Sequence, residues 1–518
     1  MSTVVRCVIL LSSILMISCT SSRKAGGIIK DDGKLEVIFV QVNDVYEIAS
    51  TSGGKAGGMS RVATIKKDYL KQNANTFLVM AGDFISPSIY NSLVYQGKRI
   101  RGKQMIEAMN AAGTDLAIFG NHEFDITEAE LQERINESAF QWIASNSFHK
   151  KGANTMPFIK ENKDSSTLFP QTHIISLKDS DGTVVRIGFI GITIPFNKAD
   201  YVEYTDPIQT AEKLFNQIKD SCDAVVAITH QKIADDILLA RKLPKLALIL
   251  GGHEHDMRFE TAGNVIITKA HANAKSAYII RLAIDKNKKT HKANPELKML
   301  DESVTFDTHT EAVVKKWTDI ANQNYASLGF DARMVLIASG DSLDGRETEA
   351  RSKPTNLTKI IVTAMAEAAP ESVISITNAG SIRVDDILYP PITQYDILRS
   401  LPFGGPIREA EIKGSLLLQI LEAGNRNHRT GGYLYYHPLQ FDSTVHKWIL
   451  HGDVINPEKI YRVAFSDFLI TGREANLEFL NKNNPAMIKL YDAETSPENS
   501  KSDIRLAIVR YLQKLNRN

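Results

Sequence analysis

The chain has 518 residues, more than one hydrophobic core usually supports, so we expect two domains. Its composition is ordinary for a soluble globular protein, and its 61 basic and 60 acidic residues give a net charge of +1. This balance excludes a global field that attracts nucleic acid or anionic lipid. We therefore expect no nucleic acid polymer as a partner and only local phosphate recognition. Nothing in the sequence fixes an oligomeric state.

The first residues have the pattern of a secretory signal. Arg6 precedes the apolar run 8–17, which is too short for a membrane-spanning helix and ends just before Cys19. A cysteine after Ile-Ser resembles the end of a bacterial lipobox, although Met16 stands where leucine is commonest. We expect a signal peptide over residues 1–19 and an exported, periplasmic protein anchored to a bacterial membrane by a lipid on Cys19. Export without a lipid and an uncleaved anchor are the alternatives.

A polar tether follows over residues 20–33, and apolar strand candidates then alternate with helical patterns, which is typical of α/β folds with a parallel or mixed sheet. Five apolar runs end at residue types that commonly bind metals. They are 35–42 before Asn43-Asp44, 76–81 before Gly82-Asp83, 116–119 before Gly120-Asn121-His122, 224–229 before His230, and 246–250 before Gly251-Gly252-His253-Glu254-His255. Because binding loops of open α/β sheets follow the carboxyl ends of strands, we expect these side chains to share one site.

A helical pattern separates this half of the chain from the next. Apolar residues recur at roughly helical spacing over about 310–328. We therefore predict a first domain over residues 34–305, a linking helix within 306–330 and a second α/β domain over 331–518.

The residue types indicate which ions the shared site binds. Carboxylate and amide oxygens combined with neutral imidazoles suit divalent ions of intermediate hardness, namely Mn, Zn, Co or Fe. A glycine precedes each of Asp83, Asn121 and His253 and permits a sharp turn there. His253 and His255 are alternate residues, which point the same way in an extended segment.

In order and approximate spacing, these motifs resemble those of the calcineurin-like metallophosphoesterases. With its second half included, the chain looks like a bacterial 5'-nucleotidase of the UDP-sugar hydrolase family. The resemblance implies an α/β fold, in which an N-terminal metallophosphoesterase β-sandwich flanked by helices precedes a second α/β substrate-binding domain. It also implies two divalent metal ions. The implied ligands are Asp83 for both ions, Asp44 and His255 for the first, and Asn121, His230 and His253 for the second.

The same resemblance assigns His122 to the phosphate or the leaving group, with Asp125 orienting its imidazole. From the residues alone, this loop could instead cap a helix, and Asp125 in particular could cap a helix that runs from Thr127 onward. Glu123 is expected to be structural or to lie behind the ligands.

Tyr46 departs from the family pattern. The family usually has histidine two residues after the first aspartate, but this chain reads Asp44-Val45-Tyr46. A phenol with an unperturbed pKa of about 10 is a poor neutral ligand. Tyr46 could bind as the phenolate, water could fill the vacancy, or the first metal could bind weakly. We expect weakened or altered occupancy of the first site.

Two aromatic residues of the second domain are expected to hold a nucleoside. By resemblance, the base would stack between Phe403 and Phe468, and each stacking contact is worth about 1–3 kcal/mol. The alternative is that both rings belong to the hydrophobic core.

Polar residues of the second domain complete the expected substrate pocket. By resemblance, Arg351 and Arg383 would contact phosphate or carboxylate groups as planar donors. Asn378 opens the loop that carries Arg383, and Glu474 stands near the place where the family has the aspartate that binds ribose hydroxyls.

The leading hypothesis is an exported, metal-dependent phosphoesterase. It would hydrolyse nucleoside 5'-monophosphates to nucleoside and phosphate through attack of a metal-activated water. A 2',3'-cyclic-nucleotide phosphodiesterase or a UDP-sugar pyrophosphatase would use the same metals and is the enzymatic alternative. A nucleotide-binding lipoprotein with weakened catalysis is the alternative from another class.

Overall fold

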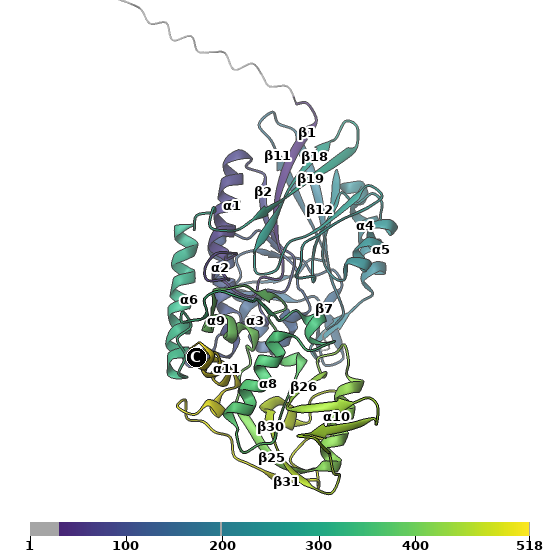
Figure 1. Ribbon diagram of the computed structural model, residues 1–518. Helices are drawn as coiled ribbons and strands as arrows, with labels where there is room; N and C mark the ends of the chain where they lie inside the picture. Colours follow the sequence, from purple (N-terminus) through teal and green to yellow (C-terminus); the bar gives the residue numbers. More distant parts are fainter. Residues whose placement is uncertain (1–30, 197–198, 517–518) are drawn as a thin grey trace, which may run out of the picture.

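A computed structural model describes residues 31–196 and 199–516 of the chain (Figure 1). The predicted signal peptide over residues 1–19, with Cys19, and most of the predicted tether lie outside the described residues. Among the helices of the described part, none is both long and apolar enough to cross a membrane.

Two six-stranded mixed sheets form the first domain. In order across the first sheet, the strands are β19 (Thr290–Met299), β18 (Ser276–Asp285), β1 (Lys34–Val42), β2 (Thr76–Met80), β5 (Leu116–Ala117) and β6 (Gln141–Trp142). In the second sheet they are β11 (Thr172–Lys178), β12 (Val184–Thr193), β14 (Ala224–His230), β15 (Leu248–Gly252), β17 (Val265–Lys269) and β16 (Arg258–Ala262).

The two sheets pack face to face and bury a hydrophobic core between them. Phe39 of β1 meets Phe189 of β12 edge to face across this core, with ring centroids 6.0 Å apart. The neighbouring residues Ile38 and Val40 point to the opposite face of the first sheet and pack beneath helices. Since both faces of β1 are covered, the strand is a nearly continuous apolar run rather than an alternating one.

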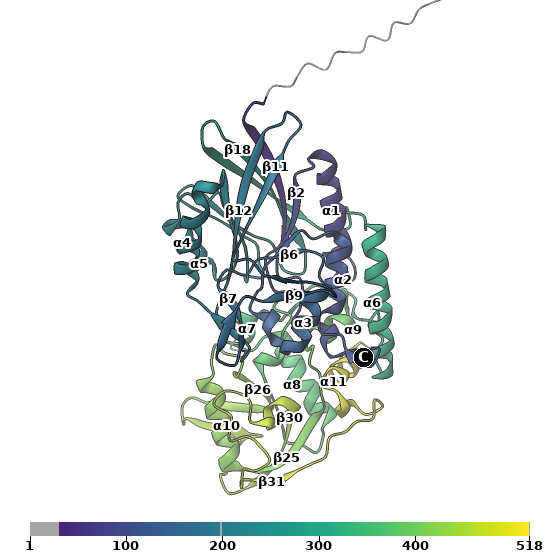
Figure 2. The ribbon, with the colours of Figure 1, turned by 180° about the vertical axis from the view of Figure 1, so that it is seen from behind.

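Helices cover both outer faces of the sandwich (Figures 1 and 2). The first sheet is covered by α1 (Met59–Gln72), α2 (Lys103–Ala112) and α6 (Thr308–Ser327), and the second by α4 (Pro207–Ile218) and α5 (Ile233–Lys242). The predicted β-sandwich flanked by helices is therefore confirmed. Smaller elements beside it are α3 (Glu128–Glu137), β7 (Ser147–Lys151), β8 (Asn154–Met156), β13 (Val202–Tyr204), β9 (Ile159–Glu161), β10 (Ser166–Leu168), β3 (Val94–Tyr95) and β4 (Lys98–Arg99).

Parallel pairing brings the carboxyl ends of the inner strands to one edge of the sandwich. Strands β1, β2 and β5 run parallel in one sheet, and β12, β14 and β15 run parallel in the other. The apolar run 116–119 predicted a strand of four residues, but β5 ends at Ala117. Beyond it the chain turns into the loop, where the Phe119 carbonyl accepts a hydrogen bond from Thr193 Oγ1 rather than a ladder bond.

The second domain contains a five-stranded mixed sheet. Its strands in order are β26 (Leu434–His437), β22 (Ile374–Asn378), β30 (Ile460–Ser466), β25 (Ile407–Lys413) and β31 (Met487–Leu490). Its helices are α7 (Glu347–Ala350), α8 (Asn356–Ala368), α9 (Gln394–Ser400), α10 (Gly414–Arg426) and α11 (Ile504–Leu515), and its short strands are β20 (Val335–Ile337), β21 (Leu343–Asp344), β23 (Ile387–Leu388), β24 (Ile392–Thr393), β27 (Leu439–Asp442), β28 (Lys447–Leu450) and β29 (Asp453–Val454). The predicted second α/β domain is confirmed.

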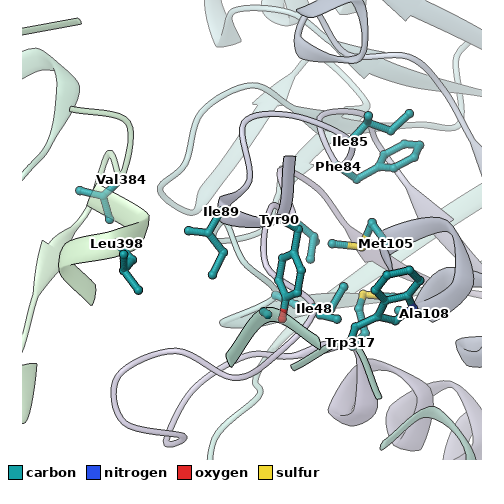
Figure 3. Packing of buried hydrophobic residues seen from close by; sticks show 14 of the residues in the cluster. Ile48, Phe84, Ile85, Ile89, Tyr90, Met105, Ala108, Trp317, Val384 and Leu398 are labelled. Atoms are coloured by element: carbon teal, nitrogen blue, oxygen red, sulfur yellow. The ribbon is translucent and has the colours of Figure 1, made fainter. Parts of the chain in front are cut away.

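One hydrophobic cluster extends through both domains (Figure 3). Ile48 and Ile89 of the first domain and Val384 and Leu398 of the second belong to this cluster, and all four are buried. The shared cluster fixes the loops of the second domain against the carboxyl edge of the sandwich.

Candidate metal centre

Two aspartates at the sandwich edge have a strained backbone. Asp44 follows β1 and Asp83 follows β2, and both are buried with φ angles of 53° and 57°. Left-handed backbone at a residue other than glycine costs about 1–3 kcal/mol and clusters at functional sites. Together with His230 at the end of β14, they place three ligand atoms within 4.8 Å of one another.

The glycines before the ligands allow this close approach. A Cβ on Gly82 would lie 2.7 Å from the Gly120 nitrogen and from His230 Nδ1, and a Cβ on Gly120 would lie 2.1 Å from Asp83 Oδ1. Any larger residue would separate the loops, so the glycines that the sequence shows before Asp83 and Asn121 are required by packing as well as by turn geometry.

His230 directs its Nε2 atom toward the carboxylate of Asp83. Its Nδ1 donates a hydrogen bond to the Ala81 carbonyl at 2.8 Å, which leaves Nε2 facing Asp83 Oδ2 at 3.1 Å. Although burial opposes it, the charges of Asp83 and Asp44 raise the pKa of His230 to about 9. A positive charge is therefore favoured between these atoms, and a divalent ion would supply it.

Asn121 Oδ1 supports a metal in the second site. In the described part of the chain it is buried without a hydrogen-bond partner, whereas His230 Nε2 has Asp83 Oδ2 at 3.1 Å. A buried polar atom without a partner is costly unless an ion satisfies it. Burial and the neighbouring His230 lower the pKa of His253 to about 3, so its imidazole is neutral, which is the form that binds metals. The residues present thus fit the second ion.

Tyr46 lies among the ligand atoms expected for the first ion. Its hydroxyl oxygen is 3.0 Å from His255 Nε2, 3.1 Å from Asp83 Oδ2 and 3.4 Å from Asp44 Oδ1. Ligand atoms around a tetrahedral ion with bonds of about 2.0–2.2 Å are spaced about 3.3–3.6 Å apart. Only the distance from Tyr46 to Asp44 falls in this range, whereas the distances of 3.0 and 3.1 Å are those of hydrogen bonds. The phenol therefore stands where the family has an imidazole, but it is not spaced from its neighbours as a metal ligand would be. Burial and Asp83 raise the pKa of Tyr46 well above 10, which favours the weakly binding phenol.

Glu123 organises the loops that carry the ligands. Its fully buried carboxylate accepts four backbone hydrogen bonds, two of which come from the nitrogens of Asp83 (2.9 Å) and Gly120 (2.6 Å). The other two come from Phe84 (2.7 Å) and Ile85 (3.0 Å). The sequence offers no local signal for this role, because three of the four donors lie about forty positions away.

His122 lies beside the metal cluster with a fixed orientation. Its Nδ1 is 2.6 Å from Asp125 Oδ2, and its Nε2 is 3.3 Å from an Nη2 atom of Arg383. An Nδ1–H donated to Asp125 leaves Nε2 as an acceptor toward the second domain. The N-cap residue of α3 is Thr127, which forms a capping box with Glu130. The alternative that Asp125 caps this helix is therefore wrong.

The second domain brings two of its predicted polar residues together. Asn378 Nδ2 donates a hydrogen bond of 2.6 Å to Glu474 Oε2, and Asn378 Oδ1 accepts one from Ser381. Arg351 instead pairs with Glu347 at 2.6 Å on α7.

Phe403 and Phe468 are outside the hydrophobic core. The two residues are 66% and 44% exposed, whereas core aromatic residues of this protein are nearly inaccessible. The alternative of two core aromatics is therefore wrong. Both rings are available for a ligand.

Asp385 is a residue of the second domain that the sequence patterns do not single out. Its Oδ2 lies 2.8 Å from Nδ1 of His255, across the boundary between the domains. No spacing rule connects residues about 130 positions apart, so only the packed domains reveal this pair.

Residues 38–257 match the calcineurin-like phosphoesterase family, and residues 336–480 match the 5'-nucleotidase C-terminal domain. The chain belongs to the calcineurin-like phosphoesterases with a 5'-nucleotidase C-terminal domain. The predicted family and the predicted enzyme class, a hydrolase of phosphate esters, are thereby confirmed. Calcineurin-like phosphoesterases use divalent metals, in agreement with the cluster of Asp44, Asp83 and His230.

Several known proteins are similar to this phosphoesterase. It is 24% identical to the trifunctional nucleotide phosphoesterase protein YfkN of Bacillus subtilis over 91% of this chain but only 34% of that protein, so it spans about a third of that relative's length. It is 24% identical to the snake venom 5'-nucleotidase of Gloydius brevicauda, over 77% of this chain and 72% of the relative. The crystal structure of a 5'-nucleotidase precursor from Thermus thermophilus shares the fold, with a TM-score of 0.66 and 20% identity over 93% of this chain and 97% of that chain.

Proposed function

We propose that this phosphoesterase hydrolyses nucleoside 5'-monophosphates to nucleoside and phosphate. The observation that carries the proposal is the meeting of three groups at one edge of the sandwich: the buried cluster of Asp44, Asp83 and His230, the oriented imidazole of His122, and Arg383 from the second domain. The names of the relatives support a nucleotide as the substrate.

Two divalent ions would be held by the side chains that converge at this edge. When bound, they would neutralise phosphoryl charge and lower the pKa of the attacking water. The holding residues would be Asp83 for both ions, Asp44 and His255 for the first, and Asn121, His230 and His253 for the second.

His122 would act on the leaving group. Asp125 holds its Nδ1, so the Nε2 atom faces the place where Arg383 enters the site. Although burial opposes it, the charges of Asp83 and Asp125 raise the pKa of His122 above its usual value. For this step Nε2, which faces Arg383 as an acceptor in the neutral ring, would take up a proton and pass it to the departing ribose oxygen.

The second domain would select the nucleoside. The exposed rings of Phe403 and Phe468 would stack on the two faces of the base, which tolerates any base. Glu474, joined to Asn378, would accept hydrogen bonds from the ribose hydroxyls. Arg351 and Arg383 would bind phosphate oxygens.

We also propose that the enzyme is exported, periplasmic and anchored to a bacterial membrane by a lipid on Cys19. The supporting observation is the sequence pattern of a charged residue, a short apolar run and a cysteine after Ile-Ser.

Purified protein tests the activity. It is stripped with a chelator, reloaded with Mn²⁺ or Zn²⁺, and assayed on 5'-AMP, 2',3'-cyclic AMP and UDP-glucose. We expect metal-dependent hydrolysis of 5'-AMP to be fastest, measured as loss of each substrate, because cleavage of the other two does not by itself free phosphate. A preference for the cyclic nucleotide or UDP-glucose would transfer the function to the diesterase or pyrophosphatase alternative, and no metal-dependent hydrolysis of any of the three would reject the enzyme.

Variants test the site in the same assay. Asp83→Ala and His122→Ala should each abolish most of the activity. Full activity in either variant would reject the assignment of the site.

A further inference from the structure

We propose that Asp385 of the second domain is a positioning residue for His255, so that the first metal site is complete only while the two domains are packed as described. This inference rests on the proposed metal-dependent function. Asp385 would not bind the ion itself but would orient the ligand His255, so that metal binding depends on the arrangement of the domains.

The geometry is that of an imidazole held between a carboxylate and a metal site. Nδ1 of His255 lies 2.8 Å from Asp385 Oδ2, while Nε2 of the same ring faces Tyr46 at 3.0 Å and Asp44 Oδ1 at 3.6 Å. An Nδ1–H donated to a carboxylate fixes the tautomer that leaves Nε2 free to bind, and it makes Nε2 a stronger donor to a cation.

The proposed ligands His230 and His255 differ in which domain supplies the hydrogen-bond partner of Nδ1. His230 of the second site donates its Nδ1–H to the Ala81 carbonyl, which belongs to the same domain. His255 of the first site depends on a side chain of the other domain. Separation of the domains would therefore release the ring of His255 and leave that of His230 held.

Asp385 is itself held in place before any ion binds. Its Oδ1 accepts a hydrogen bond of 2.5 Å from the Glu347 nitrogen at the start of α7, and its backbone has a left-handed φ of 39°. Next to it, Val384 is anchored in the hydrophobic cluster that both domains share (Figure 3). A carboxylate fixed in this way loses little side-chain entropy when it orients His255.

The segment 383–386 makes three separate polar contacts with the first domain. Arg383 reaches His122, Asp385 reaches His255, and Asp386 forms an ion pair with Lys275. Only the contact of Asp385 reaches a residue expected to bind the first ion. The contact of Asp386 therefore provides a matched control for a general loss of domain packing.

Metal binding by the full-length chain tests the inference. Chelator-stripped wild type, Asp385→Asn and Asp386→Asn are titrated with Mn²⁺, and electron paramagnetic resonance distinguishes isolated Mn²⁺ ions from coupled pairs. Asparagine keeps the size of the side chain and tolerates left-handed backbone, so Asp385→Asn removes the charge with little strain.

We expect the wild type to bind two ions, and Asp386→Asn to bind both with wild-type affinities. In Asp385→Asn, one ion should bind about 10–100-fold more weakly while the other is unchanged, so that isolated ions replace coupled pairs at limiting Mn²⁺. Phosphate release by Asp385→Asn should recover when the Mn²⁺ concentration is raised, which a misfolded protein would not do.

Three results would overturn the inference while leaving the proposed function in place. They are wild-type affinities in Asp385→Asn, equal weakening in Asp386→Asn, and an active wild type that binds a single ion. A wild type that neither binds Mn²⁺ nor hydrolyses a nucleotide would instead overturn the proposed function, and the inference with it.

Discussion

Replacement of Glu123 by glutamine tests how the ligand loops are held together. The carboxylate has two oxygens, and each accepts two backbone N–H groups. A glutamine keeps one oxygen, which can satisfy two of the four donors. Its NH₂ group points a donor at the other two N–H groups and leaves both buried and unpaired.

The cost follows from these two lost partners. An unpaired buried N–H costs about 1–3 kcal/mol, so Glu123→Gln should destabilise the protein by about 2–6 kcal/mol. At roughly 2–4 °C per kcal/mol for a domain of this size, the melting temperature should fall by about 4–24 °C. Metal content should fall as well, because the donors include the nitrogen of Asp83, which belongs to the candidate metal cluster.

Thermal unfolding of the chelator-treated protein measures the first effect, and elemental analysis after reloading with Mn²⁺ measures the second. Glu203→Gln is the matched control, since the Glu203 side chain is 49% exposed and pairs with Lys150 at the surface. The control should change stability by less than about 0.5 kcal/mol. A melting temperature of Glu123→Gln within about 2 °C of the control would refute the argument.

Three further predictions concern the two domains and the amino terminus. Tyr46→His should raise the apparent affinity for divalent ions, because a neutral imidazole binds them better than a phenol; a competition titration against a chelator that gives the wild-type curve would reject this account. Phe403→Ala and Phe468→Ala should each raise KM for 5'-AMP by about 5–150-fold, the equivalent of about 1–3 kcal/mol of lost stacking, with metal content unchanged; a wild-type KM would remove the ring from the nucleoside pocket. Cys19→Ala should abolish membrane association in fractionated cells, whereas a variant that stays bound and unprocessed would identify an anchor.

Local patterns predicted the elements that surround the site. The run 35–42 corresponds to β1, which extends over Lys34–Val42, and the helical spacing over about 310–328 corresponds to α6 at Thr308–Ser327. These predictions succeed because a strand buried on both faces and a helix covering a sheet each impose their own periodicity on neighbouring residues. The strand over 116–119 was predicted too long, since apolar character alone does not mark where pairing stops.

Other features depend on partners that are distant in the sequence. The loop at His122 reads equally well as a helix cap or as part of a site, and only the structure shows that Thr127 caps α3 while His122 contacts Asp125 and Arg383. The place of the Tyr46 hydroxyl among three ligand side chains is likewise visible only after folding.

The sequence by itself determined the family, the enzyme class and the set of residue types that converge at the carboxyl ends of the strands, because ordered motifs at strand ends record the chemistry directly. The tertiary structure alone decided that Glu123 binds four backbone donors and that Asp385 holds His255. Those contacts arise from the packing of loops and domains, which leaves no periodic trace in the neighbouring sequence.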